Sequence, residues 1–292
     1  MGYTSFLYRQ FFVHPPPVPP SLALEEQVIL ITGSNSGIGL EAARHCVKLN
    51  AHNIILAVRN LDRGEAAKAD ILRTCPRSKT NIEIWHLDME SFSSVLSFGK
   101  KAQSLARLDV AILNAGVFKA EWDTTDDGYE SSLQVNHLST ALLSLLLLPP
   151  LRQTSRTLQR PTRLTFSSSE VHMWTSFKQQ SSPHILTTYN TESRFSTMTD
   201  HYFVSKLLNV FWIRELVTRL ASTSENEGEV VINFFNPGGV KTGLHRDTKP
   251  MQIFDALTGR TAEEGGRLVI DAAFLKGRDT HGCYLSEAKV VE

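Results

Sequence analysis

Residues 28–40 of this chain read VILITGSNSGIGL, and this stretch carries the most information about the fold. Its apolar start at 28–31 predicts a buried strand, and residues 40–47 predict a helix. A strand, a glycine turn and a helix start in this order form a phosphate cradle. Glycines let the backbone approach a pyrophosphate, and the free N–H groups of the helix attract its negative charge. Because the Gly-x-x-x-Gly-x-Gly spacing is only moderately specific, a glycine-rich turn without a ligand is the alternative.

The same alternation of strand and helix continues along the chain. Further strands are expected at 53–58, 81–85, 109–113, 163–166 and 230–235, with helices at 62–73 and 91–107. Short apolar strands separated by helices predict a parallel sheet that helices cover on both faces. No linker or second glycine motif divides the chain. The sequence therefore predicts an α/β protein: a doubly wound parallel sheet (Rossmann fold) in a single three-layer α/β/α domain.

Two segments fall outside this alternation. The run PPPVPP at 15–20 predicts a stiff, extended, Pro-rich leader over residues 1–20, before the single α/β domain over residues 21–292. Residues 173–199 are rich in Ser, Thr, Gln and Asn, and they form an insertion near the predicted substrate pocket. We expect Trp174 and Phe195 of this insertion to border the substrate entrance; packing away from the pocket is the alternative.

Composition excludes several classes of protein. The 292 residues include 30 Lys and Arg against 30 Asp and Glu, so no net charge attracts nucleic acid or an anionic membrane. The three cysteines lie far apart, and no metal site is expected. The apolar run at 141–148 is too short to span a bilayer and predicts the end of a core helix, closed by Pro149 and Pro150. We expect a soluble, cytoplasmic protein without a transmembrane segment, and leave a homo-oligomer open.

The residue that contacts the adenosine ribose is expected about 20 residues past the glycines, at the end of the second strand. That strand ends Ala57-Val58-Arg59, without a carboxylate to accept a hydrogen bond from the 2′-hydroxyl of NAD. The planar guanidinium of Arg59 suits the 2′-phosphate of NADP. The sequence therefore predicts NADP(H), with NAD less favoured; a solvated surface arginine is the alternative interpretation.

Polar and small residues follow the next two strands. The carboxylate of Asp88 can accept a hydrogen bond from an adenine amino group, or it can cap a helix. Asn114, Ala115 and Gly116 lie where ligands bind in open α/β sheets, at the carboxyl edge, and their small size leaves room for a cofactor.

Tyr202 and Lys206 form the strongest chemical pair, because residues four apart share one face of a helix. A neighbouring cation lowers the pKa of a phenol from its ordinary value of about 10. Such a phenol can deliver a proton to a carbonyl oxygen as hydride reaches the carbon. A hydroxyl from the Ser167-Ser168-Ser169 run, at the end of a core strand, can hydrogen-bond the same oxygen. A surface pair of Tyr and Lys is the alternative.

Taken together, these motifs resemble those of the short-chain dehydrogenase/reductase family. The matching segments are TGSNSGIG at 32–39, NAG at 114–116, Asn136 in VNHL, Ser169, Tyr202-x-x-x-Lys206 and NPG at 236–238, in the family's order. Within the family, the segments LAVRN at 56–60, QVNHL at 134–138 and SSEVH at 168–172 are most similar to the retinol-dehydrogenase-like branch and its fungal relatives tied to secondary metabolism.

The resemblance implies a role for each matching residue. Tyr202 would be the general acid/base, Ser169 (with Ser168 as the second choice) would polarise the carbonyl, Lys206 would hold the nicotinamide ribose and depress the phenol pKa, and Asn136 would place a water in the proton relay. The implied cofactor-binding residues are Gly33, Ser34, Ser36, Gly37, Ile38, Gly39, Arg59, Asp88, Asn114, Ala115, Gly116, Tyr202, Lys206, Pro237, Gly238, Val240 and Thr242.

Three other functions compete with this interpretation, and the sequence argues against each of them. A non-catalytic NAD(P)-sensing protein could share this fold, although the presence of both Tyr202 and Lys206 weighs against it. A serine hydrolase does not fit, because Asn35 occupies the centre of the only Gly-x-x-x-Gly that resembles a nucleophile elbow. A nucleotide-sugar epimerase usually has a different glycine spacing. We therefore expect an oxidoreductase that interconverts a carbonyl and an alcohol on a lipophilic small molecule.

Overall fold

A computed structural model describes residues 2–191, 197–221, 228–245 and 248–291. Its centre is a sheet with the strand order β3-β2-β1-β4-β5-β6-β7-β8, in which only the β7–β8 pair is antiparallel. The order reverses direction between β1 and β4, which creates the crevice where doubly wound sheets bind ligands. The strands are β1 (Val28–Thr32), β2 (Asn53–Val58), β3 (Asn81–His86), β4 (Val110–Leu113), β5 (Thr162–Ser167), β6 (Val230–Asn236), β7 (Tyr284–Ser286) and β8 (Lys289–Val291).

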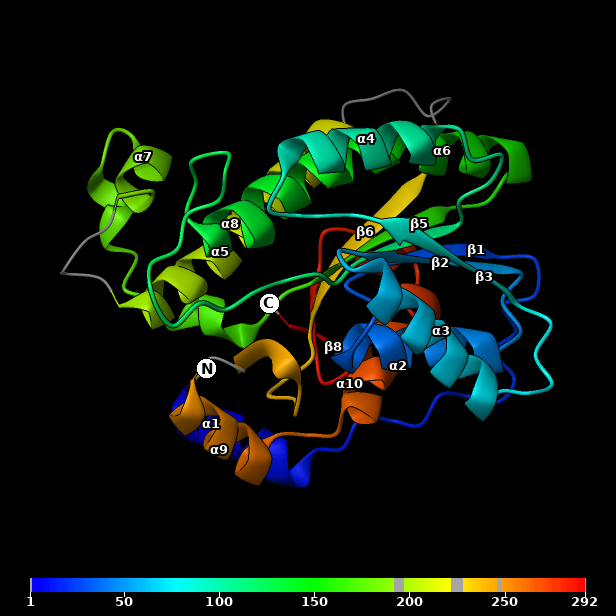
Figure 1. Cartoon of the computed structure of the whole chain (residues 1–292), viewed down its shortest axis with the longest axis horizontal. Helices are drawn as coiled ribbons and strands as arrows, with labels where there is room; N and C mark the ends of the chain where they lie inside the picture. The colour runs from blue at the N-terminus through cyan, green and yellow to red at the C-terminus, as the bar shows by residue number, and fades with distance from the viewer. Residues whose placement is uncertain (1, 192–196, 222–227, 246–247, 292) are drawn as a thin grey trace.

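Helices cover both faces of the sheet (Figure 1). One face carries α2 (Gly37–Lys48), α3 (Leu61–Thr74) and α10 (Ala262–Ile270), and the other carries α4 (Phe92–Gln103), α6 (Ser139–Leu158) and α8 (Met198–Ala221). Successive strand residues point to opposite faces. Leu30 and Ile55 accordingly pack in one buried cluster, whereas Ile29 and Ile54 pack in the other. The predicted three-layer α/β/α fold is confirmed.

The helix α6 corrects one expectation, because it does not end at Pro149 and Pro150 but continues to Leu158. Proline lacks the N–H that would bond the carbonyl four residues earlier. The carbonyl that Pro150 leaves free, on Leu146, instead accepts a hydrogen bond from Gln103 Nε2 at 3.4 Å. Among the described residues, 131–158 form the one helical stretch long and apolar enough to cross a membrane, and 72% of its most apolar window is buried inside the protein.

The sequence did not predict a helix at the N-terminus, where it suggested only a leader. Residues Tyr3–Phe12 form α1, which lies beside α9 (Lys249–Thr258) at one edge of the molecule (Figure 1). Residues 13–19 are irregular, as a Pro-rich segment requires. The first helix therefore packs against the domain instead of preceding it.

The described part of the insertion at 173–199 packs partly on itself and partly on α8. Its described part contains the short helices η3 (Lys178–Ser181) and α7 (Ile185–Tyr189), and α7 lies far from the sheet in Figure 1. Phe177 and Ile185 pack against a small buried cluster that includes Tyr189 and Leu208, apart from the two main clusters. Phe195 lies outside the described residues, so the prediction for it stays a prediction.

Candidate active site

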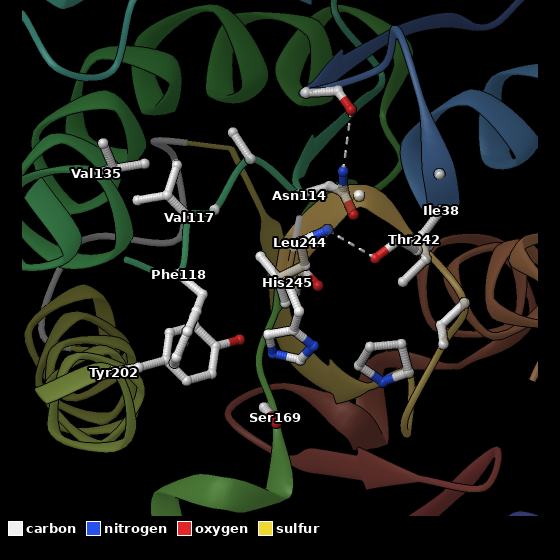
Figure 2. Close-up of a pocket in the computed structure, with 18 of the residues that line it drawn as sticks. Ile38, Asn114, Val117, Phe118, Val135, Ser169, Tyr202, Thr242, Leu244 and His245 are labelled. Carbon is white, nitrogen blue, oxygen red and sulfur yellow. Dashed lines mark hydrogen bonds between the residues drawn. The ribbon is translucent and has the colours of Figure 1, made fainter. Parts of the chain in front are cut away.

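A cavity of about 610 Å³ opens at the carboxyl ends of the strands (Figure 2). It brings together residues that are far apart in the sequence, and most of the predicted site residues line it. These are Gly33, Ser36, Gly37, Ile38, Arg59, Asp88, Asn114, Ala115, Gly116, Ser169, Tyr202, Lys206, Pro237, Gly238, Val240 and Thr242. Tyr202 and Ser169 project from different segments, with Ile38 and Thr242 across the cavity from Tyr202 in Figure 2.

The glycine turn has the geometry of a phosphate cradle. Gly37 has a φ of +57°, and a Cβ atom on Gly39 would lie 2.5 Å from the carbonyl oxygen of Gly33. Glycine is therefore required at both positions. Ser36, the N-cap of α2, makes no side-chain capping bond, so the first N–H groups of this helix face the cavity without an internal acceptor from that side chain. This arrangement fits the pyrophosphate of a dinucleotide.

Three predicted residues do not line the cavity. The Ser34 hydroxyl is buried and donates to the carbonyl oxygen of Ile31 at 3.0 Å, so it stabilises the turn from within. Gly39 instead permits the close packing between the turn and α2. Asn136 lies behind the cavity wall, and Asn35, which the sequence did not single out, takes part in the lining.

Asn114 fixes the distance between the turn and β4. Its Nδ2 donates to the Thr32 carbonyl oxygen at 3.1 Å, and the Thr32 hydroxyl accepts from the backbone N–H groups of Asn114 and Ala115, each at 2.9 Å. These bonds hold Gly116, where a Cβ atom would lie 3.1 Å from Asn136 Oδ1. Ala115 and Gly116 therefore leave open the space in which the sequence analysis predicts a cofactor.

Two arginines and two carboxylates line the end of the cavity beside β2, where the sequence predicts the adenosine of the cofactor. The guanidinium of Arg59 is half exposed and lies 2.6 Å from the carboxylate of Glu90, while Arg63 from the first turn of α3 lines the same region. Asp88 Oδ1 accepts from the backbone N–H of Glu90 at 2.9 Å. Arg63 is a second cation that sequence reasoning missed, although its position four residues after Arg59 on a predicted helix start was a usable signal.

The catalytic candidates meet at the other end. Tyr202 and Lys206 lie on α8, and Lys206 Nζ is 5.7 Å from the centroid of the Tyr202 ring and 3.4 Å from the Ser167 carbonyl oxygen. The Ser169 hydroxyl accepts a long bond of 3.4 Å from the backbone N–H of Val171, and the Ser169 carbonyl lies 2.5 Å from His172 Nδ1. Ser169 is thus oriented by the turn that follows it.

The expected depression of the phenol pKa by Lys206 is not found. Burial raises the pKa of Tyr202, and the nearby carboxylate of Asp255 raises it further. Burial also lowers the pKa of Lys206 to about 8, because the site disfavours its charge. Both shifts have desolvation as their largest cause, so the protein itself holds the phenol protonated and makes the amine easier to deprotonate.

The lysine shift predicts how stability depends on pH. The unfolded chain binds more protons than the folded one between the folded pKa of about 8 and the ordinary value of about 10.5, so the free energy of unfolding rises with pH in that window. Replacing Lys206 with Met should stabilise the protein at pH 7, and this advantage should shrink by roughly 1 kcal/mol between pH 8 and pH 9.

Urea unfolding of cofactor-free protein at pH 7, 8 and 9 measures this difference. Lys100→Met, at an exposed position of α4, controls for the loss of one positive charge. A stability difference between wild type and Lys206→Met that stays constant across this range contradicts the prediction.

Asn136 belongs to a π-helical turn, η1 (Gln134–Leu138). Its Nδ2 donates to the Val117 carbonyl oxygen at 2.9 Å and to the Ser205 hydroxyl at 3.0 Å, and its Oδ1 accepts from the Val117 N–H at 2.8 Å. Asn209 Nδ2 donates to its backbone carbonyl at 2.6 Å. Such π-helical turns are frequent at functional sites. Asn136 links α8 to the loop after β4; its predicted role in placing a water stays a prediction.

Further residues also line the cavity. Among the described residues of the insertion, Trp174 reaches it, and its predicted role at a substrate entrance stays a prediction. His245 Nδ1 lies 2.6 Å from Asp255 Oδ2, and the His245 ring packs edge-to-face on Phe118, at 5.0 Å between centroids. The aromatic and apolar part of the lining includes Phe6, Phe118, Trp174, Phe203, Met251 and Phe254.

Comparison with known proteins places this site in context. Residues 27–157 match the family model of short chain dehydrogenases. The short chain dehydrogenase sol3 of Alternaria solani is 40% identical over 288 residues, which cover 98% of each chain. The short chain dehydrogenase atnD of Emericella nidulans is 39% identical over 294 residues, covering 97% of this chain and 91% of that relative.

A solved structure agrees in fold. A putative short chain dehydrogenase from Escherichia coli CFT073, complexed with NADPH, superposes with a TM-score of 0.69 at 21% identity, over 92% of this chain and 99% of that one. The family model and these relatives show that the protein is an oxidoreductase of the dehydrogenase class. The chain belongs to the short-chain dehydrogenase/reductase family.

Proposed function

We propose that this enzyme reduces a carbonyl, or oxidises the matching alcohol, on a lipophilic small molecule, with NADP(H) as cofactor. The observation that carries the proposal is the shared cavity. It joins the glycine cradle and Arg59 at one end to Tyr202, Ser169 and Lys206 at the other. A dinucleotide fits along this line because the cradle is built from glycines whose Cβ atoms would collide with backbone.

In the proposed mechanism, bound NADPH supplies the hydride. The Tyr202 phenol, which burial keeps protonated, donates its proton to the carbonyl oxygen of the substrate. The Ser169 hydroxyl donates a hydrogen bond to the same oxygen and stabilises the charge that develops there. Lys206 holds the ribose beside the phenol, and Pro237, Gly238, Val240 and Thr242 border the nicotinamide.

NADP(H) is proposed over NAD(H) on the charges at the adenosine end. Arg59 and Arg63 both line that part of the cavity, and a 2′-phosphate accepts charge-assisted hydrogen bonds from such groups. Glu90 pairs with Arg59 at 2.6 Å. Asp88 is proposed to accept from the adenine amino group.

The substrate class is proposed from the lining. Aromatic and sulfur-containing side chains surround the cavity, so an apolar carbon skeleton gains burial there while the reacting oxygen meets Ser169 and Tyr202. The similarity to fungal short chain dehydrogenases supports a role in secondary-metabolite biosynthesis of the polyketide type, which we propose here. A cytoplasmic location is proposed as well. The similarity of the segments at 56–60, 134–138 and 168–172 to the retinol-dehydrogenase-like branch stays a prediction.

Incubation of the purified protein with NADPH and a panel of ketones, aldehydes and quinones tests the proposal. We expect loss of NADPH absorbance with an apolar cyclic ketone and little with a small hydrophilic aldehyde. NADPH binding without turnover of any carbonyl, and without oxidation of the corresponding alcohols by NADP, contradicts catalysis and favours the sensing alternative.

A further inference from the structure

The N-terminal helix α1 is built into the active site through buried polar contacts. Gln10, only 5% exposed, uses both ends of its amide on Gly239: Nε2 donates to the carbonyl oxygen at 2.8 Å, and Oε1 accepts from the N–H at 3.0 Å. Nε2 also donates to the Thr258 carbonyl oxygen at 3.1 Å, on α9. Gly238, which precedes Gly239, lies so close to α1 that a Cβ atom on it would be 2.5 Å from Gln10 Oε1.

A second contact links the same helix to the turn that carries Ser169. Arg9 Nη2 lies 2.7 Å from Oε2 of Glu170, whose side chain is almost fully buried. Asn236 Nδ2 donates to the same carboxylate at 3.1 Å, and Asn236 Oδ1 accepts from the N–H of Gly238 at 3.0 Å. A buried carboxylate is costly without a cation partner, so Arg9 stabilises Glu170 in the position that follows Ser169.

The end of α1 is fixed as well. Arg260 Nη2 donates to the carbonyl oxygens of Arg9 at 3.1 Å and of Val13 at 2.8 Å, and it pairs with Glu287 at 2.6 Å. A cation at the C-terminus of a helix satisfies its free carbonyls and its dipole. Three segments of the domain therefore hold the helix in one place.

Phe6 is the residue that α1 presents to the cavity. Its side chain is 7% exposed, and its ring meets the Trp174 ring edge-to-face at 5.4 Å between centroids. Trp174 in turn lies 6.1 Å from the ring of Phe203, the neighbour of Tyr202. Three distant segments thus form one aromatic wall beside the catalytic phenol.

We propose that α1 determines substrate specificity: Phe6 contacts the apolar body of the substrate, and Arg9 and Gln10 are positioning residues for the turns at Ser169 and Gly238. The inference rests on the proposed function and extends it, because it assigns the chemical class of the substrate. An aromatic wall of this kind selects a planar, ring-bearing ketone or alcohol over an aliphatic one, since rings gain edge and face contacts there.

The test compares Phe6→Ala with Phe12→Ala, a matched control on the same helix whose ring is 70% exposed. The probes are 1-tetralone and cyclohexanone. Calorimetric titration of each ketone into the protein–NADPH complex measures binding, and NADPH consumption measures turnover. Phe6→Ala should lower the preference for 1-tetralone by about tenfold with the Kd for NADPH unchanged, and Phe12→Ala should behave as wild type.

Identical ketone binding by wild type and both variants overturns the inference and shows that α1 serves only structural packing. Ketone binding that depends on Phe6 without any turnover by the wild type overturns the proposed function alone. The two failures are therefore distinguishable.

The positioning role of Arg9 is tested by comparing the changes in kcat and KM. Arg9→Met should lower kcat more than it changes KM, because Ser169 shifts while the aromatic wall stays. Arg9→Lys and the double variant Arg9→Met with Glu170→Gln should recover kcat, the first by restoring a cation and the second by removing the buried charge. A loss of thermal stability with unchanged kcat in Arg9→Met overturns this part of the proposal.

Discussion

Replacing Tyr202 with Phe is expected to lower the rate of carbonyl reduction by about 10²–10⁴-fold, the usual contribution of a general acid. The ring still packs against Phe118, whose centroid lies 5.6 Å away, so the fold of the pocket should persist. Only the phenol proton is lost. The Kd for NADPH should therefore stay within a few-fold of the wild-type value, and the effect should appear in kcat.

Tyr189→Phe is the matched control for this experiment. Tyr189 is fully buried, does not line the cavity, and donates from its hydroxyl to the His201 carbonyl oxygen at 2.5 Å. Its removal should cost about 1 kcal/mol of stability and leave turnover intact. Steady-state kinetics at saturating NADPH decide between the two tyrosines, and a Tyr202→Phe enzyme within a few-fold of wild type refutes the mechanism.

The second large effect concerns cofactor choice. Replacing Arg59 with Asp should weaken NADPH binding roughly tenfold to a hundredfold relative to NADH, since a charge-assisted hydrogen bond is replaced by repulsion of the 2′-phosphate. The new carboxylate can accept from the 2′-hydroxyl of NADH instead. Fluorescence titration of both reduced cofactors gives the ratio of the two dissociation constants.

Arg73→Asp provides the control, because Arg73 is an exposed arginine of α3 outside the cavity lining. It changes the net charge equally without touching the adenosine end. An unchanged ratio of dissociation constants in Arg59→Asp shows that the Arg59–Glu90 pair is only a surface ion pair. A shift in Arg59→Asp together with a smaller one in Arg63→Asp assigns the 2′-phosphate to both cations.

Sequence patterns within a single strand, turn or helix predicted those parts of the site that depend on one element alone. The glycine turn was recognisable because Gly37 and Gly39 are demanded by backbone geometry between a strand and a helix. The faces of α8 followed from helical periodicity, which puts Tyr202 and Lys206 on one side. The sheet followed from short apolar strands in alternation with helices.

What the sequence could not reveal depends on contacts between distant segments. Lys206 was expected to act on the phenol, but the pKa shifts of both groups follow from burial, which no spacing records. The sequence could not show that the Ser34 hydroxyl points into the protein, because residues on the two sides of the glycine turn look alike in sequence. Gln10 could not be recognised, since its partner is the backbone of Gly239, 229 residues away.

The separation between α1 and its partners has a consequence for how the enzyme is made. This helix is synthesised before the residues that hold it, because Glu170 lies 161 residues downstream of Arg9, and Arg260 lies 251 residues downstream of the Arg9 carbonyl that it binds. At usual rates of synthesis, about 5–20 residues per second, α1 waits roughly 10–50 s before its last partners exist. Because such long-range contacts form late in folding, the nascent chain can assemble its sheet before α1 covers the active-site cavity. The helix α1 is therefore made before its partners but docks after them, and the pocket is completed only once both Glu170 and Arg260 have been synthesised.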